Sequence, residues 1–180
     1  MGIRPALMAL ALAAACATQA AEAPARAVQQ RVKAAFLYKF AAYVEWPAKA
    51  FPQAQSPIVI GVAGDDTVAA ELGDVVTGRL VDGRPVEVRR LDDDQPAGDC
   101  CQILFVAGDS PRAHDLLEGV RGRPVLTVTE FEEQQPPGSI INFLAGGERV
   151  RFDISRAAAE RNGLHLRSPL LAVAHLVRNE

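Results

Sequence analysis

The stretch CQILFVAGDSPRAHDLLEGVRGRPVLTVTE (residues 101–130) places an amphipathic segment between two apolar runs. The runs at 101–110 and 123–130 are typical of buried strands, because apolar residues occur without a polar alternation. The segment between them begins with Pro111 and ends with Gly122, which favour the first turn and the end of a helix. This order predicts a βαβ unit, whose two strands lie parallel in one sheet.

The same alternation extends in both directions from this unit. The further predicted elements are strands at 57–64 and 84–91, a helix at 65–76, two strands within 139–155 joined at Gly146-Gly147, a helix after Ser155 that ends near Gly163, a short strand at 164–167 and a helix at 168–179 capped by Ser168. Together they predict an α/β fold with a mainly parallel mixed β-sheet flanked by helices, and with a C-terminal antiparallel hairpin.

An aromatic helix is predicted before the first strand, over residues 27–45. Its stretch VKAAFLYKFAAYVEWP (32–47) repeats apolar residues at helical spacing, and Phe36 and Phe40 fall on the face expected to pack against the sheet. Lys33 is expected on the remaining, polar side. Pro47 cannot continue a helix and disfavours helical backbone at Trp46, so the helix is expected to stop there.

The first residues are typical of an export signal. Arg4 is followed by an apolar run of small residues and leucines that is too short to span a bilayer, and cleavage is expected after Ala20. Acylation at Cys16, as in a lipoprotein, is the alternative. The expected organisation is a signal peptide at 1–20, a short linker at 21–26 and a single α/β domain at 27–180.

Cleavage leaves two cysteines, the adjacent Cys100 and Cys101. An oxidising compartment favours pairing of thiols, but the mature chain contains no distant partner cysteine. Three arrangements therefore remain open: a disulfide between the two neighbours, a bridge between two chains, and two free thiols, one facing the core.

The sequence contains no motif that argues for an enzyme, a metal or a cofactor. The three histidines are far apart and lack metal-ligand spacing, and no nucleophile elbow or dinucleotide fingerprint is present. Asp65, Asp66 and Asp109 follow predicted strands, as in a phospho-acceptor receiver, but they are better explained as caps of helix N-termini. The net charge of −3 does not favour nucleic acid.

Several motifs resemble the YfiR family of exported proteins, in the same order along the chain. They are KAAFLYKFAAYVEWP, CQILFVA, PVLTVTE, INFLAGGERVRFDIS, RAAAERNGL and SPLLAVA, and the resemblance spans about residues 30–177. Phe36, Phe40, Trp46 and Pro47 belong to its opening signature. Lys39 and Ser155 stand where asparagine is usual in the family.

The resemblance implies a periplasmic repressor. Such a protein binds the periplasmic sensor domain of a membrane-bound diguanylate cyclase, lowers cyclic-di-GMP synthesis and thereby affects biofilm formation. It also implies a homodimer and sensitivity to redox conditions. Cys101 matches the family cysteine before QILF, but no second cysteine is available for a long-range bridge.

The sequence offers one candidate contact surface, for which an ordinary solvated hairpin is the alternative interpretation, and one candidate crevice for a ligand. In ERVRFDISR (148–156) polar residues alternate with apolar ones, so Arg151, Asp153 and Ser155 are expected on a solvated face followed by Arg156. Arg151, Asp153 and Arg156 are the candidate contacts with the cyclase. The alternative function is a periplasmic sensor module that binds a small ligand in the crevice near Gly64, Gly108 and Thr129.

Overall fold

A computed structural model describes residues 26–92, 97, 100–108, 110–132, 134–144 and 149–179. The expected signal peptide, the alternative lipid site at Cys16, the capping role of Asp109 and the turn at Gly146-Gly147 lie outside these residues.

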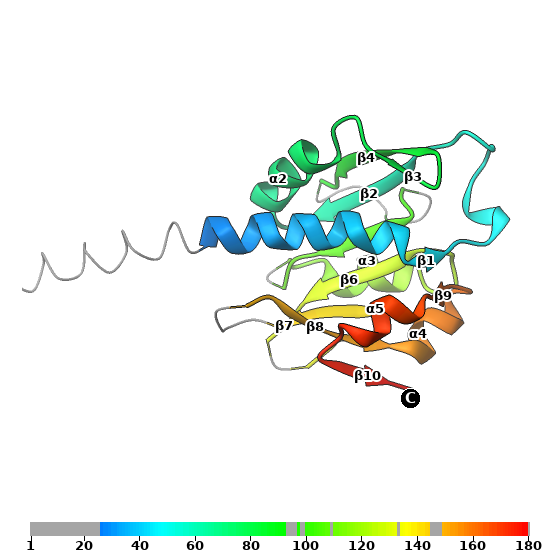
Figure 1. Ribbon diagram of the computed structural model, residues 1–180. Helices are drawn as coiled ribbons and strands as arrows, with labels where there is room; N and C mark the ends of the chain where they lie inside the picture. The colour runs from blue at the N-terminus through cyan, green and yellow to red at the C-terminus, as the bar shows by residue number, and fades with distance from the viewer. Residues whose placement is uncertain are drawn as a thin grey trace, which may run out of the picture.

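The strands of the described chain form one large sheet and one small one (Figure 1). The large sheet has eight strands in the order β10-β8-β7-β6-β5-β2-β4-β3. Their bounds are β2 Ile58–Ala63, β3 Leu80–Val81, β4 Arg84–Arg90, β5 Ile103–Val106, β6 Leu126–Glu130, β7 Ile141–Leu144, β8 Arg151–Ser155 and β10 Leu176–Arg178. Within this sheet, as far as the structure describes it, only the β3–β4 and β7–β8 pairs are antiparallel. The predicted fold class, including the antiparallel hairpin, is confirmed.

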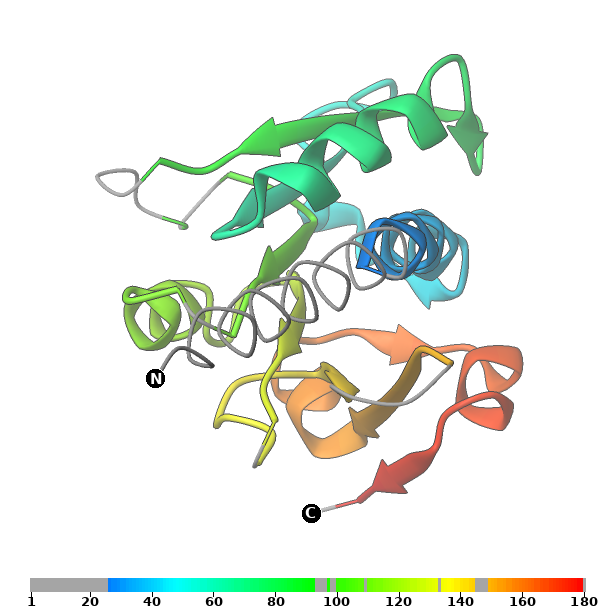
Figure 2. The same cartoon turned by 90° about the vertical axis from the view of Figure 1, so that its left-hand side faces the viewer.

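Helices cover both faces of the large sheet. They are the first helix (residues 26–42), α2 Asp66–Val76, α3 Ala113–Gly119, α4 Arg156–Arg161 and α5 Ser168–Ala172, with a 3₁₀ turn, η1, at Ala48–Ala50. The first helix and α3 lie on opposite sides of the sheet (Figure 2). Strand β5 is therefore buried on both faces. Phe105 packs in the cluster under the first helix, and Leu104 packs in the cluster with α3.

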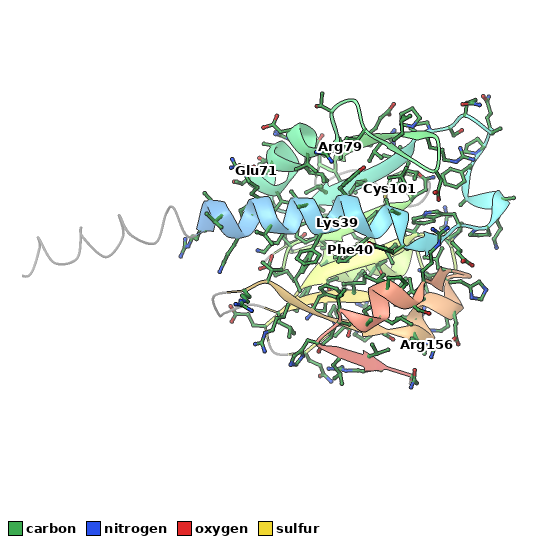
Figure 3. All side chains as sticks on the ribbon, in the orientation of Figure 1. Lys39, Phe40, Glu71, Arg79, Cys101 and Arg156 are labelled. Atoms are coloured by element: carbon green, nitrogen blue, oxygen red, sulfur yellow. A yellow bond between two sulfur atoms is a disulfide. The ribbon has the colours of Figure 1, made fainter. Side chains whose placement is uncertain are left out.

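Phe36 and Phe40 of the first helix join a cluster of rings on the sheet; Figure 3 labels Phe40. Phe40 is fully buried, and its ring centroid lies 5.9 Å from that of Phe143 and 5.2 Å from that of Phe152. Phe36 is half-buried and contacts the same two rings. Phe143 and Phe152 face each other across the β7–β8 hairpin, so this ring cluster fixes the helix on that part of the sheet.

The first helix ends earlier than predicted. Its helical residues stop at 42, and Val44–Glu45 form the short strand β1, which pairs antiparallel with β9 (His165–Leu166). The backbone N–H of Arg167 also donates to the carbonyl of Tyr43. A strand partner far along the chain thus takes these residues out of the helix, whereas Pro47 itself is extended, with φ −65° and ψ 149°. Trp46 packs edge-on against Phe51.

The prediction of a final helix over residues 168–179 is correct only for its first part. Helix α5 ends at Ala172, and Leu176–Arg178 form strand β10, which lies parallel to β8. The expectation of a helix through residue 179 is wrong because the edge of β8 offers backbone hydrogen bonds: the His175 N–H donates to the carbonyl of Phe152. Strand β3, which pairs with the start of β4, was not predicted.

Of the predicted helix caps, Asp65 and Ser155 are confirmed, whereas Asp66 is the first residue of α2 and not its cap. The Asp65 carboxylate accepts a hydrogen bond from the Val68 N–H, and the Ser155 hydroxyl accepts one from the Ala158 N–H. Helix α5 begins at Ser168 itself, and the preceding residue, Arg167, forms no side-chain cap. The proposed capping role of Ser168 is therefore wrong.

Candidate functional site

An open cleft lies where strands β2, β5 and β6 end. The strand order reverses at β2. Strand β4, which follows β2 and α2 in the chain, lies on one side of β2, and the next strand of the chain, β5, lies on the other side. Open α/β sheets bind ligands outside the carboxyl ends of strands at such a reversal. The cleft at this point has a volume of about 930 Å³.

Two glycines give this cleft a floor of bare backbone. Gly64 has a φ of +82°, a conformation that disfavours other residues. A Cβ atom at Gly108 would overlap the carbonyl oxygen of Glu130. Both glycines line the cleft, as predicted for the crevice. A side chain at either position would be strained or would collide with a neighbouring segment, so glycine suits both positions where β2 and β5 end.

One wall of the cleft is an ion pair between the first helix and the end of β6. The ammonium of Lys33 lies 2.6 Å and 2.8 Å from the two carboxylate oxygens of Glu130. The Lys33 side chain is 9% exposed and that of Glu130 is 22% exposed. Lys33 belongs to the charged part of the helix surface, and the structure adds that it is buried there because Glu130 pairs with it at the cleft wall.

Hydrogen bonds continue this wall across to α2. Lys33 also donates to the side-chain oxygen of Gln30, at 3.1 Å, and the Gln30 amide donates to Asp65, at 2.9 Å. Asp65 in turn caps α2. The carboxyl end of β6, the first helix and the start of α2 are thus connected by one chain of polar contacts around the cleft.

A second contact holds α2 against the first helix away from the cleft. The Arg31 guanidinium donates to Glu71 at 2.9 Å, and the hydrogen bond and charge of Glu71 raise the pKa of Arg31. Arg79 lies over the ring of Tyr38, 5.3 Å from its centroid. These contacts are exposed or half-buried, and they orient the two helices that flank the cleft.

Thr129 does not line the cleft, although the sequence placed it near Gly64 and Gly108. Its side chain is buried in a polar layer on the α3 side of the sheet, where its hydroxyl donates to Asn142 at 2.8 Å. Asn142 also exchanges two hydrogen bonds with the backbone of Phe131. The segment after β6 is thereby folded over this face.

This polar layer changes the interpretation of β8. Asn142 lies opposite Asp153 in the β7–β8 register, and Leu176 lies opposite Asp153 on its other side. Asp153 is only 5% exposed and Ser155 is buried, so the expected solvated face is wrong for both. The alternation of β8 reflects two buried faces, one aromatic and one polar, and Arg151 alone is exposed within the strand.

Asp153 binds the outermost strand to the sheet. Its carboxylate lies 2.9 Å from the imidazole of His175 and 3.6 Å from the guanidinium of Arg178. The three candidate contacts are thus not equivalent: Arg151 and Arg156 are exposed at the two ends of β8, whereas Asp153 is held between β8 and β10. Arg156 follows β8 at the start of α4 (Figure 3).

Exposed apolar side chains lie at this same edge. Val173 is 64% exposed and Leu176 is 45% exposed. Strand β10 pairs with β8 on one side, and among the described residues no strand pairs with its other side. We call Arg151, Val173, Leu176 and Arg178 the β10 edge. It combines apolar surface, basic charge and an open strand.

The two cysteines lie at the opposite end of β5 from the cleft. In the structure the sulfur atoms of Cys100 and Cys101 are bonded to each other, which is the first of the three arrangements considered above. Cys101 is buried, and its sulfur lies against the backbone of Gly61 in β2. The pair is thus part of the packing where β5 begins.

The described residues show neither a metal centre nor a membrane span. No group of three or more His, Cys, Asp and Glu side chains among them could hold a metal ion. None of the helices they form is long and apolar enough to cross a bilayer.

Comparison with known families gives one match. A family model described as YfiR/HmsC-like matches residues 30–175. The match includes both partners of the cleft wall, Lys33 and Glu130, and it extends through β8 to His175, the residue that pairs with Asp153.

Proposed function

The chain belongs to the YfiR/HmsC-like family, and we propose that it binds the periplasmic sensor domain of a membrane diguanylate cyclase and represses cyclic-di-GMP synthesis. The family is periplasmic and regulatory. Membership therefore supports a regulator that acts on another protein rather than on a metabolite pool.

The observation that carries this proposal is the β10 edge. Exposed apolar side chains next to an open strand are features of protein-binding surfaces, since a partner can bury the side chains and pair with the backbone. Leu176 and Val173 provide the apolar part, and Arg151 provides positive charge, whereas the charge of Arg178 is paired with Asp153. A partner with an acidic rim around an apolar centre fits this combination.

The candidate contacts have different roles in this proposal. Arg151 and Arg156 are exposed and can contact the cyclase directly. Asp153 is buried and acts by holding His175 and Arg178, and so β10, in place. A homodimer, expected from the family resemblance, is part of the same proposal and is tested by the mass of the purified protein in solution.

The test compares two exposed leucines on opposite edges of the sheet. Leu176→Asp lies in the proposed interface, and Leu80→Asp, on β3 at the far edge, is its matched control. We expect Leu176→Asp to weaken binding to the purified periplasmic domain by more than about tenfold, as for an interface residue that costs over about 1.4 kcal/mol. Cyclic-di-GMP in cells should rise accordingly, with Leu80→Asp behaving as wild type.

Melting temperatures of both variants serve as the folding control. Equal repression by wild type, Leu176→Asp and Arg151→Glu, all with normal melting temperatures, would place the interface elsewhere. Failure of the wild-type protein to bind the sensor domain at all would refute the proposed function itself.

A further inference from the structure

We propose that the cleft at the ends of β2, β5 and β6 binds a small organic cation that carries a primary ammonium group. This inference is independent of the cyclase interface, since the cleft and the β10 edge involve different strands. It concerns the purified chain alone.

The size and position of the cleft support a ligand site. Its volume of about 930 Å³ falls in the range of about 300–1,000 Å³ typical of small-molecule sites. It lies at the point where the strand order reverses, between Gly64 after β2 and Gly108 after β5. That is the place where the topology of an open α/β sheet leaves a crevice that no crossover helix fills.

The charge of the residues that line the cleft indicates which chemical class of ligand it would bind. Among the described residues, three carboxylates line the cleft, Asp65, Glu130 and Glu132, and two cations, Arg26 and Lys33, oppose them. This part of the lining therefore has one negative charge in excess. A cationic ligand would balance this charge, whereas an anion would add to it.

Hydrogen-bonding capacity favours the same class. The three N–H groups of Lys33 have three acceptors within reach, the two oxygens of Glu130 and the side-chain oxygen of Gln30. An ammonium group has three N–H donors, so Lys33 has none left for a ligand. The carboxylate of Glu130 retains acceptor capacity, because each oxygen can accept more than one bond.

A second, exposed carboxylate lies at this rim. Glu132 follows Glu130 by two residues, is exposed and lines the cleft with it. Phe131, between them in the chain, also lines the cleft and packs against the apolar cluster on the α3 side. Carboxylates bind ammonium ions in proteins through ion pairing with hydrogen bonds.

The binding test uses three four-carbon compounds that differ in charge. They are 1,4-diaminobutane, the neutral 1,4-butanediol and the dianion succinate, each titrated into the purified protein by calorimetry at low salt. We expect 1,4-diaminobutane to bind with a Kd below about 1 mM, and the diol and succinate to bind at least about tenfold more weakly.

Substitution at Glu132 locates the site. Glu132→Gln should weaken binding of 1,4-diaminobutane by about threefold, and Glu132→Lys by more than about tenfold, since each removes attraction near the rim. Glu87→Gln and Glu87→Lys are matched controls on an exposed position of β4, and they should leave Kd unchanged. Melting temperatures verify that all four variants fold.

Three results would overturn the inference. They are no saturable binding of 1,4-diaminobutane by the wild-type protein, equal binding of the three compounds, and an equal loss of binding in the Glu132 and Glu87 variants. None of these results affects the cyclase proposal, whose test uses the sensor domain.

Discussion

Lys33 and Glu130 are 97 residues apart in the chain, and their side chains form a nearly buried ion pair with an N–O distance of 2.6 Å. The pair joins the first helix to the end of β6 beside the cleft. A buried ion pair stabilises a fold little more than a well-packed apolar pair would. Substitution of only one partner is costly, because the other charge is then buried without an opposite charge.

Substitution of one partner of this pair is expected to destabilise the protein more than substitution of both. Lys33→Met should lower the free energy of unfolding by about 2–4 kcal/mol, because the carboxylate of Glu130 is left unpaired. The double variant Lys33→Met/Glu130→Met should recover part of this loss, with a coupling of about 1–3 kcal/mol. Urea unfolding measures each value.

The control for this cycle is an exposed ion pair. Arg121 and Glu118 lie 3.1 Å apart on the surface, and Arg121→Met should cost less than about 1 kcal/mol. Similar small losses for Lys33→Met and Arg121→Met would contradict the buried character of the first pair.

The aromatic cluster predicts that two alanine substitutions near each other in the first helical segment differ strongly in their effect on stability. Phe40→Ala should lower the free energy of unfolding by about 3–5 kcal/mol, since the ring is fully buried between the helix and the hairpin. Tyr43→Ala, at a residue that is 36% exposed, should cost about 1 kcal/mol or less. Chemical denaturation of the two variants tests this, and a soluble Phe40→Ala protein of normal stability would refute the packing role.

Asp153 is expected to behave as a buried residue and not as a surface contact. Asp153→Ala should cost about 2–4 kcal/mol, because it leaves His175 and Arg178 without their carboxylate and opens the polar layer. Arg151→Ala, exposed on the same strand, should change stability by less than about 0.5 kcal/mol. Equal melting temperatures for the two variants would mean that β10 does not depend on Asp153.

The cysteine pair is expected to contribute little stability through cross-linking. A bond between neighbours closes no long loop in the unfolded chain, so reduction should shift Tm by less than about 2 °C. Cys101→Ser should cost more than Cys100→Ser, because Cys101 is the buried member of the pair. A fall of many degrees on reduction, measured by thermal unfolding, would show that the bridge has a larger role.

The sequence was sufficient for the central sheet because its strands are short apolar runs with clear helix signals between them. The cap at Ser155 acts locally, so its position follows from neighbouring residues. Helix α3 was placed correctly but is shorter than predicted: it covers Ala113–Gly119, inside the expected limits at Pro111 and Gly122. Two short strands could not be predicted in this way. Leu176–Arg178 and Val44–Glu45 are strands only because β8 and β9 offer unpaired backbone groups, and neither partner is visible in the local pattern.

The candidate site was predictable only in outline. Gly64 and Gly108 follow strands, and so the crevice was expected from the topology. The burial of Lys33 could not be predicted from helical spacing, because it depends on Glu130 at the end of a distant strand. Similarly, the period of two in β8 cannot tell a solvated face from one covered by the segment after β6, which Asn142 holds in place.

Several partners of the first helix are far from it in the chain, and this separation bears on folding. The rings of Phe143 and Phe152, the carboxylate of Glu130 and the strand β9 all lie about 90 residues or more after the helix in the chain. Contacts between such distant residues form slowly, because a large loop must close before any of them can form. The first helix is therefore synthesised long before the hairpin, and until β7 and β8 form, Phe36 and Phe40 lack the rings of Phe143 and Phe152 as packing partners.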